Sequence, residues 1–179
     1  HQISFGENCK VAGSNMVQRS GNSGKLLAVR MYSLNGSGNS NLIDGNLVEF
    51  DPAYSNAIDN LDIPKISNFG ENIGIQKGNA ILAFERHASI VHTDTIFYQL
   101  GQLRQQSYQL EFTAQDLAEP GLTAYLEDNY LHTTTTINLN QVSLIDFVVN
   151  ADPASKAPDR FRLVFNQLGP VPVTFTSIS

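Results

Sequence analysis

The sequence predicts an all-β protein, specifically a two-sheet antiparallel β-sandwich of the jelly-roll type. Short apolar runs of strand length recur along the chain, and each is closed by Gly, Asn, Asp or Pro. Residues 108–113 alternate strictly, with Tyr108, Leu110 and Phe112 on one face and polar side chains on the other. No long segment repeats its apolar residues with the helical period of 3.6, which argues against a helical domain.

The apolar runs place the individual strands and the core. Strands are expected at 26–32, 46–50, 72–76, 80–85, 95–100, 107–113, 122–127, 134–139, 143–149, 160–165 and 171–177. The inward side chains that we expect to fill the core include Leu27, Val29, Tyr108, Leu110, Phe112, Phe161 and Leu163. One short helix is expected at 52–61, where Ala53, Ala57, Ile58 and Leu61 could share a face.

Changes in amino-acid composition along the chain predict three parts. Residues 1–24 are rich in Ser, Asn and Gly and predict an irregular lead-in with room for one edge strand. Residues 25–168 carry the apolar runs and form the β-sandwich domain. Residues 169–179 begin with Gly-Pro-Val-Pro and continue into an alternating segment, which is typical of a linker that leads into the first strand of a further module. We therefore expect a fragment of a larger protein.

Composition narrows the range of functions. The net charge of −6 with only 11 basic residues argues against nucleic acid as a partner, because phosphate binding requires clustered Lys and Arg. No apolar run approaches the length needed to cross a bilayer, so no membrane insertion is expected. Cys9 is the single cysteine, which excludes an internal disulfide and a zinc site of several thiolates.

Four segments resemble a β-sandwich domain of long Bacteroidetes surface proteins, located just before the C-terminal modules that lead to a type IX secretion sorting signal. The segments are LVEFDPAYSNAID at 47–59, DTIF at 94–97, AYLED at 124–128 and APDRFRLVF at 157–165. The closing PVTFTS at 172–177 resembles the start of the module that normally follows. The resemblance implies an extracellular or cell-surface location, and it brings no ligand or active site with it.

This context leaves two functions from different classes. The first is a non-catalytic accessory domain that binds glycan or another cell-surface ligand, and so serves adhesion. The second is a structural spacer that contacts the neighbouring domains of the same chain and presents the sorting module. An exposed aromatic platform would favour binding, whereas extensive contacts with both neighbours would favour the spacer.

A glycan site is expected on loops that carry tyrosine, because sugars stack on aromatic faces while amides and carboxylates bind their hydroxyls. Tyr54 and Tyr130 are the tyrosines expected on loops, and Asp128 and Asn129 adjoin the second. The alternative interpretation is that a loop tyrosine is half-buried against the protein, with its hydroxyl in water.

A structural calcium ion is the one cofactor that the sequence favours. Asp51, Asp59 and Asp62, with Asn56 and Asn60, place five oxygen donors within twelve residues. The same residue types also close turns and cap helices, which is the alternative interpretation. No cofactor is required by the sequence.

Catalysis is not expected. The nucleophile motif Gly-x-Ser-x-Gly is missing, and the candidate acid pair Glu111 and Glu127 is more simply explained by solvated strand faces. Glu85, His87 and His92 could in principle form a metal site with two histidines and a carboxylate, but their spacing matches no established ligand motif.

Overall fold

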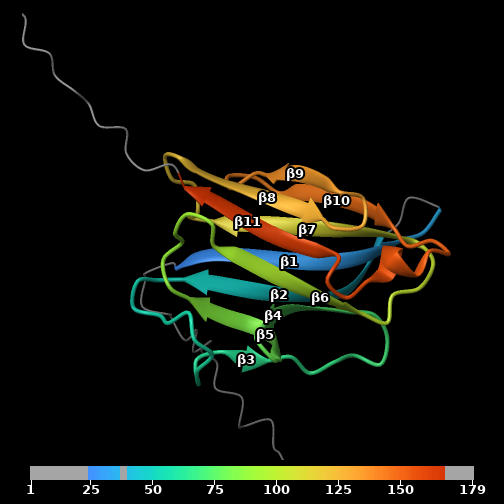
Figure 1. Ribbon diagram of the computed structural model, residues 1–179, viewed down its shortest axis with the longest axis horizontal. Helices are drawn as coiled ribbons and strands as arrows, with labels where there is room; N and C mark the ends of the chain where they lie inside the picture. Colours follow the sequence, from blue (N-terminus) through green and yellow to red (C-terminus); the bar gives the residue numbers. More distant parts are fainter. Residues whose placement is uncertain (1–23, 37–39, 168–179) are drawn as a thin grey trace, which may run out of the picture.

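The computed structural model describes residues 24–36 and 40–167, and this part of the chain is all-β. The strands are β1 (Lys25–Leu34), β2 (Ser40–Phe50), β3 (Ile63–Pro64), β4 (Asn72–Lys77), β5 (Ala80–His87), β6 (Thr95–Gly101), β7 (Ser107–Gln115), β8 (Leu122–Asp128), β9 (Thr133–Ile137), β10 (Ser143–Val148) and β11 (Phe161–Gln167) (Figure 1). Within these residues a 3-10 turn, η2 (Pro153–Lys156), precedes β11. The all-β class is therefore confirmed.

Each predicted strand within the described residues is present. The ends are shifted by up to six residues, the largest shift being the start of β2 at Ser40 instead of Asn46. The alternation predicted for β7 is also confirmed, since Tyr108, Leu110 and Phe112 are fully buried. Of the expected core, the remaining members Leu27, Val29, Phe161 and Leu163 are at most 2% exposed. The strand predicted at 171–177, the lead-in up to residue 23 with Cys9, and the linker from residue 169 lie outside the described residues.

The strands join into one continuous mixed sheet in the order β10-β7-β1-β2-β5-β4-β6-β11-β8-β9, with β3 paired to β5. All pairs are antiparallel except β2 with β5, which is parallel between Leu47 and Phe50. The two separate sheets of the expected jelly-roll sandwich are not confirmed. Alternation in a sequence reveals which face of a strand is buried, but it does not reveal which strands pair.

The sheet folds back on itself into two walls, so that it resembles a nearly closed, flattened barrel (Figure 1). We call β10, β7, β1, β2 and β5 the first wall, and β4, β6, β11, β8 and β9 the second wall. Aromatic rings meet between them: Phe50 packs edge-on against Phe165, and Tyr98 against Phe112, with ring centroids 5.7 and 6.2 Å apart. These contacts place the core between the walls.

The sheet path ends at β9 and β10, and we call the space between these two strands the seam. Thr133 and Thr135 on β9 pair with the buried residues Asp128 and Leu126 of β8, yet both threonines are exposed. Their side of β9 is therefore not covered by the first wall. The seam is the place where the barrel remains open.

The helix expected at 52–61 does not form, and this prediction was wrong. Local side chains capture the backbone N–H groups instead: Asp51 Oδ1 accepts from Ala53, Ser55 Oγ from Ala57, and Asp59 Oδ1 from Leu61. Such bonds stabilise turns in competition with a helix. The apolar face of the expected helix also has no core to cover, because Ile58 and Leu61 are exposed.

Two short elements were not predicted from the sequence. β3 has only two residues, and it pairs with β5 through a register shift. η2 begins after Asp152, whose side chain accepts a hydrogen bond from the Ala154 N–H and so caps the turn. Within the described residues, none of the helical structure is long and apolar enough to span a membrane.

Candidate functional site

A groove of 420 Å³ opens on the outer face of the second wall, across β4, β6 and β11. Its lining consists of Gln76, Phe97, Tyr98, Gln99, Pro158, Asp159 and Phe161. Tyr98 and Phe161 are buried members of this lining, while the other members come from the outer face and the turn before β11. Apolar lining with a few polar groups is the usual make-up of a small-molecule site.

Phe97 is the central side chain of this groove. In β6, Ile96, Tyr98 and Leu100 point into the core, so strand alternation directs Phe97 and Gln99 outward. Nearly half of the Phe97 surface, 48%, remains exposed. An aromatic ring in this position presents an apolar face to the solvent between polar neighbours.

The strand register sets those neighbours in a row across the second wall. Gln76 of β4 pairs with Phe97, and Phe97 pairs on its other side with Arg162 of β11. Arg162 in turn pairs with Glu127 of β8, and its Nε lies 2.6 Å from the Glu127 carboxylate. The ring is thus flanked by an amide on one side and by an ion pair on the other.

The rim of the groove is held by backbone hydrogen bonds. The Leu100 N–H donates to the Pro158 carbonyl, and the Asn129 side-chain amide donates to the Asp159 carbonyl at 2.7 Å. These bonds fix the turn that carries Pro158 and Asp159 against β6 and β8. The groove is therefore built on rigid elements, as a binding site requires.

Gln99 supplies a polar group that the rest of the described chain does not use. Its side-chain carbonyl oxygen is buried and has no hydrogen-bond partner among the described residues. Buried polar atoms are normally paired, because an unpaired one costs the full desolvation penalty. This oxygen is enclosed by the fold and is not presented to the groove.

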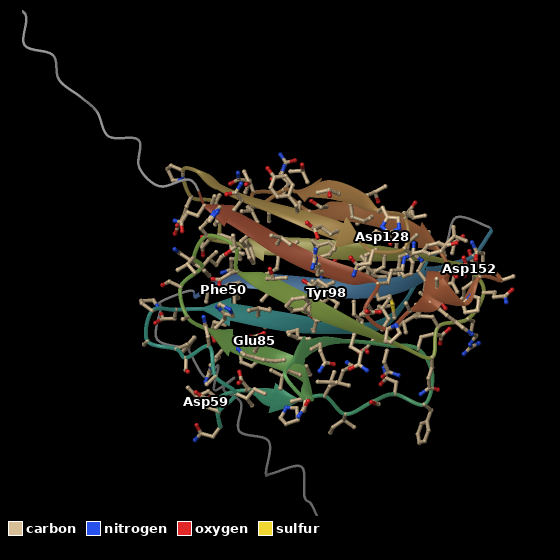
Figure 2. The ribbon with its side chains drawn as sticks, in the orientation of Figure 1. Phe50, Asp59, Glu85, Tyr98, Asp128 and Asp152 are labelled. Atoms are coloured by element: carbon tan, nitrogen blue, oxygen red, sulfur yellow. The ribbon has the colours of Figure 1, made fainter. Side chains whose placement is uncertain are left out.

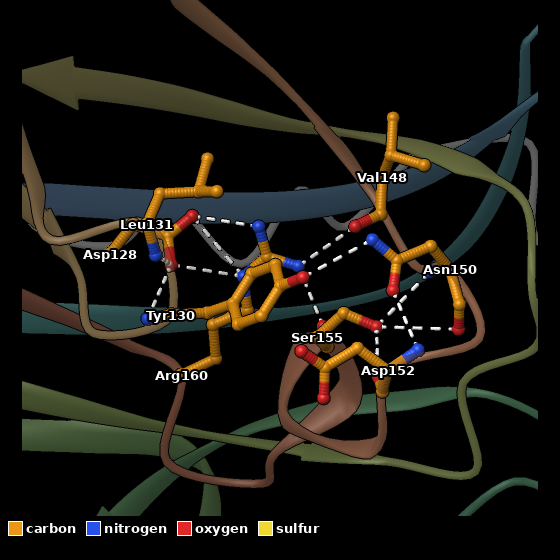
Figure 3. A network of polar contacts seen from close by, with 8 residues as sticks. All are labelled: Asp128, Tyr130, Leu131, Val148, Asn150, Asp152, Ser155 and Arg160. Carbon is orange, nitrogen blue, oxygen red and sulfur yellow. Dashed lines mark hydrogen bonds and ion pairs between the residues drawn. The ribbon is translucent and has the colours of Figure 1, made fainter.

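Beside the groove, a buried network surrounds Arg160, which is 1% exposed (Figure 3). Its Nη2 lies 2.8 Å from the Asp128 carboxylate, and its Nη1 donates to the carbonyls of Val148 and Ser155. The guanidinium also lies about 5 Å from the ring centroids of Tyr130, Phe147 and Phe161. Arg160 therefore ties β8 to the end of β10 across the seam, where backbone pairing is missing.

The structure gives the residues of the predicted glycan site other partners. Asp128 is buried and paired with Arg160, and Tyr130 lies over the same guanidinium while its hydroxyl accepts from Asn150. Asn129 supports the rim of the groove through Asp159. Asp128 is linked to the groove through the pairing of β8 with β11, where it lies opposite Phe161.

Tyr54 lies away from the other three residues of the predicted glycan site. Figure 2 shows Phe50 and Asp59, which bracket it in the sequence, toward one end of the barrel, and Asp128 toward the opposite end. The Tyr54 ring faces the Arg86 guanidinium at 5.3 Å. Partial burial, together with the Glu49 carboxylate, raises the pKa of its hydroxyl. The predicted residues therefore do not form one site.

The three carboxylates expected to bind calcium are each engaged with the backbone. Asp51 accepts from Ala53 and Asp59 accepts from Leu61, while the buried Asp62 accepts from the N–H groups of Arg86 and Asp59. Within residues 24–36 and 40–167, no group of three or more His, Cys, Asp or Glu side chains is placed to hold a metal ion.

We expect calcium to leave the melting temperature unchanged, because these carboxylates serve as turn acceptors. Thermal unfolding in millimolar calcium against chelator measures this directly. Asp62→Ala should lower the free energy of unfolding by about 1–3 kcal/mol, since the Arg86 N–H loses its acceptor. Asp59→Ala, at an exposed turn, is the milder comparison. A calcium-dependent rise in melting temperature that Asp62→Ala removes would restore the calcium site.

The three residues considered for a metal site with two histidines and a carboxylate are separated or already have partners. Glu85 is buried and forms an ion pair with Lys77, while His87 packs against Phe50 and its Nδ1 lies 2.8 Å from the Ala88 carbonyl. His92 is exposed on the loop that precedes β6.

The acid pair considered for catalysis is also separated in the sheet. Glu111 on β7 is held by Arg30 and Glu127 on β8 by Arg162, and these two strands are not neighbours. Both carboxylates point outward, Glu111 from the first wall and Glu127 from the second, so they do not face each other across a common cleft.

The groove itself was missed from the sequence, although a signal for it was present. The segment Thr95 to Leu100 was predicted as a strand, and its alternation puts Ile96, Tyr98 and Leu100 on one face. Phe97 is then an aromatic residue on the polar face, which marks an exposed ring.

Comparison of the chain with family models, with curated proteins and with solved structures gives no match.

Proposed function

We propose that this chain is a non-catalytic accessory domain of an extracellular or cell-surface protein, and that it binds glycan in the groove around Phe97. The observation that carries the proposal is the exposed Phe97 ring, flanked by Gln76 and by the Arg162–Glu127 pair. A sugar presents an apolar C–H face and a rim of hydroxyls. The groove offers a complement to both.

The polar neighbours suit hydroxyl recognition. Gln76 can donate and accept, the Gln99 amide nitrogen can donate, and the Asp159 carboxylate accepts. The Arg162 guanidinium, beside Phe97 in the sheet, donates. Amide groups, a carboxylate and one guanidinium that is already paired match a sugar better than they match a phosphate.

The proposal also covers the type of fold, the cell-surface location and the absence of a nucleic-acid partner. The flattened barrel, with aromatic contacts between its walls, can be regarded as a jelly-roll variant whose two sheets are joined through β5 and β4. The sequence resemblance to a domain of type IX-secreted surface proteins supports a location at the cell surface, where glycan binding would serve adhesion. The scarcity of lysine and arginine supports the expectation that nucleic acid is not a partner.

The structural spacer is the second candidate, and one observation favours it. The segment between β2 and β4 carries five exposed apolar side chains, of which Ile66 and Phe69 are almost completely exposed at 91% and 108%. The others are Ile58, Leu61 and Ile63. Exposed apolar side chains of this kind are typical of a surface that contacts another domain.

Phe97→Ala tests the proposed glycan function. About half of the ring is left for a ligand to bury, so its loss should weaken binding about five- to tenfold, roughly 1–1.5 kcal/mol. Affinity electrophoresis in gels that contain soluble polysaccharides measures the change. The matched control is Leu144→Ala, an equally exposed apolar residue on β10 of the first wall, which should bind normally. Equal binding by both variants would exclude the groove.

A further inference from the structure

The outer face of the second wall carries a second aromatic ring, at a distance from the groove. Tyr125 of β8 pairs with Val164 of β11, which pairs with Thr95 of β6. This row runs beside the row that contains Phe97 and Arg162, displaced by two residues along the strands. Alternation places Tyr125 on the outer face with Glu127, since Ala124 and Leu126 are buried.

The spacing of the two rings follows from the sheet geometry. Phe97 and Tyr125 lie on strands separated by one intervening strand, β11, and they are offset by two residues. With ~4.8 Å between strands and ~3.3 Å per residue, their Cα atoms are about 12 Å apart. A single sugar that stacks on Phe97 cannot also reach Tyr125, whereas an extended chain of sugars can contact both.

The side chains between and beyond the two rings extend the row of groups that could contact a ligand. Arg162 and Val164 lie between them, and the row through Tyr125 ends at Thr136 on the edge strand β9. Thr134 and Thr136 are both exposed and point to the outer face beside Glu127 and Tyr125. The hydrogen-bonding groups therefore extend well past the 420 Å³ groove, toward β9.

The charges on this face argue against an acidic ligand. Arg162 is the cation of this face, and its Nε already lies 2.6 Å from the Glu127 carboxylate. Asp159 adds a second carboxylate at the rim of the groove. With two carboxylates against one guanidinium, and a net charge of −6 on the whole chain, a polyanion would be repelled.

We infer that the ligand is an extended, uncharged oligosaccharide chain that lies obliquely across β6, β11 and β8 and stacks on both Phe97 and Tyr125. This inference rests on the proposed glycan function and narrows it to one ligand class. A chain end or a single sugar would use the groove alone, and an acidic polysaccharide is excluded by charge.

The test compares short with long oligosaccharides on the intact chain. Isothermal titration uses cello-, xylo-, manno- and chito-oligosaccharides of two and six sugars, with polygalacturonate as the anionic probe. The hexasaccharide of the preferred series should bind at least about fivefold more tightly than the disaccharide, because it alone buries the second ring. Polygalacturonate should bind no better than the disaccharide.

Substitutions of the two aromatic residues distinguish the extended-chain inference from the proposed glycan function on which it rests. Tyr125→Ala should remove the advantage of the hexasaccharide and leave disaccharide binding unchanged, whereas Phe97→Ala should weaken both. Tyr125→Leu keeps the partial burial and removes the flat ring, so it should behave as Tyr125→Ala does. Tyr32→Ala, on β1 of the first wall, is the matched control.

Each remaining outcome has a defined meaning. Equal affinity for two and six sugars, or an equal loss on both with Tyr125→Ala, would overturn the extended chain while the glycan function stands. Tight binding of polygalacturonate would overturn the uncharged class. Failure of the wild-type protein to bind any probe in the panel would overturn both the inference and the proposed function.

Discussion

Replacement of Arg160 by methionine should lower the free energy of unfolding by about 3–5 kcal/mol, because it leaves the buried Asp128 carboxylate without its partner. The guanidinium also donates to the Val148 and Ser155 carbonyls and lies among three aromatic rings. All of these interactions disappear together. The link from Asp128 of β8 through Arg160 to Val148 of β10 is then lost.

Urea unfolding measures this loss, and Arg162→Met is its matched control. Arg162 lies in β11, two residues after Arg160, and also pairs with a carboxylate, but its side chain is 43% exposed. Exposed pairs contribute little, so the control should lose less than about 1 kcal/mol. The double variant Arg160→Met with Asp128→Leu should recover part of the loss, since no buried charge remains. Similar losses for Arg160→Met and Arg162→Met would show that Arg160 does not hold the seam.

Replacement of Asn46 by leucine should raise the free energy of unfolding by about 1–3 kcal/mol, because it removes a buried polar group that has no partner. Asn46 is 7% exposed on the inner face of β2, directly beside Val29 of β1. In the described part of the chain, neither its amide nitrogen nor its oxygen is hydrogen-bonded. An apolar side chain of similar size suits this position better.

The same urea titration measures this gain. The control is Asn41→Leu on an exposed position of β2, where the change should stay within about 0.5 kcal/mol. A stability of the Asn46→Leu variant below that of the wild type would show that the amide makes hydrogen bonds through water that the fold requires. Tyr98 offers a parallel case, because its hydroxyl is also buried and unpartnered, and burial raises its pKa.

The strands and their buried faces could be predicted because they depend on local sequence. Alternation in β7, for example, is enough to put Tyr108, Leu110 and Phe112 in the core. The pairing of strands depends on contacts between distant segments, such as the parallel pair of β2 and β5. A single sequence contains no signal for this pair, so the continuous sheet could not be distinguished from two separate sheets.

The functional predictions were limited for the same reason. Tyr130 and Asp128 have the composition of a sugar site, but Arg160, 30 residues or more along the chain, engages both of them in the fold. Asp51, Asp59 and Asp62 are close in sequence, yet each faces a different backbone group. By contrast, the exposed position of Phe97 depends on alternation alone, so it was accessible from the sequence.

Chemical-shift mapping of the ¹⁵N-labelled protein during titration with neutral hexasaccharides tests the location of the binding site most directly. We predict that the perturbed amides cluster on the outer face of the second wall, around Gln76, Phe97, Gln99, Tyr125 and Arg162. Amides of β1 and β7, on the first wall, should not shift. Shifts concentrated around Ile66 and Phe69, or the absence of any shift with every sugar in the panel, would contradict a glycan site at Phe97.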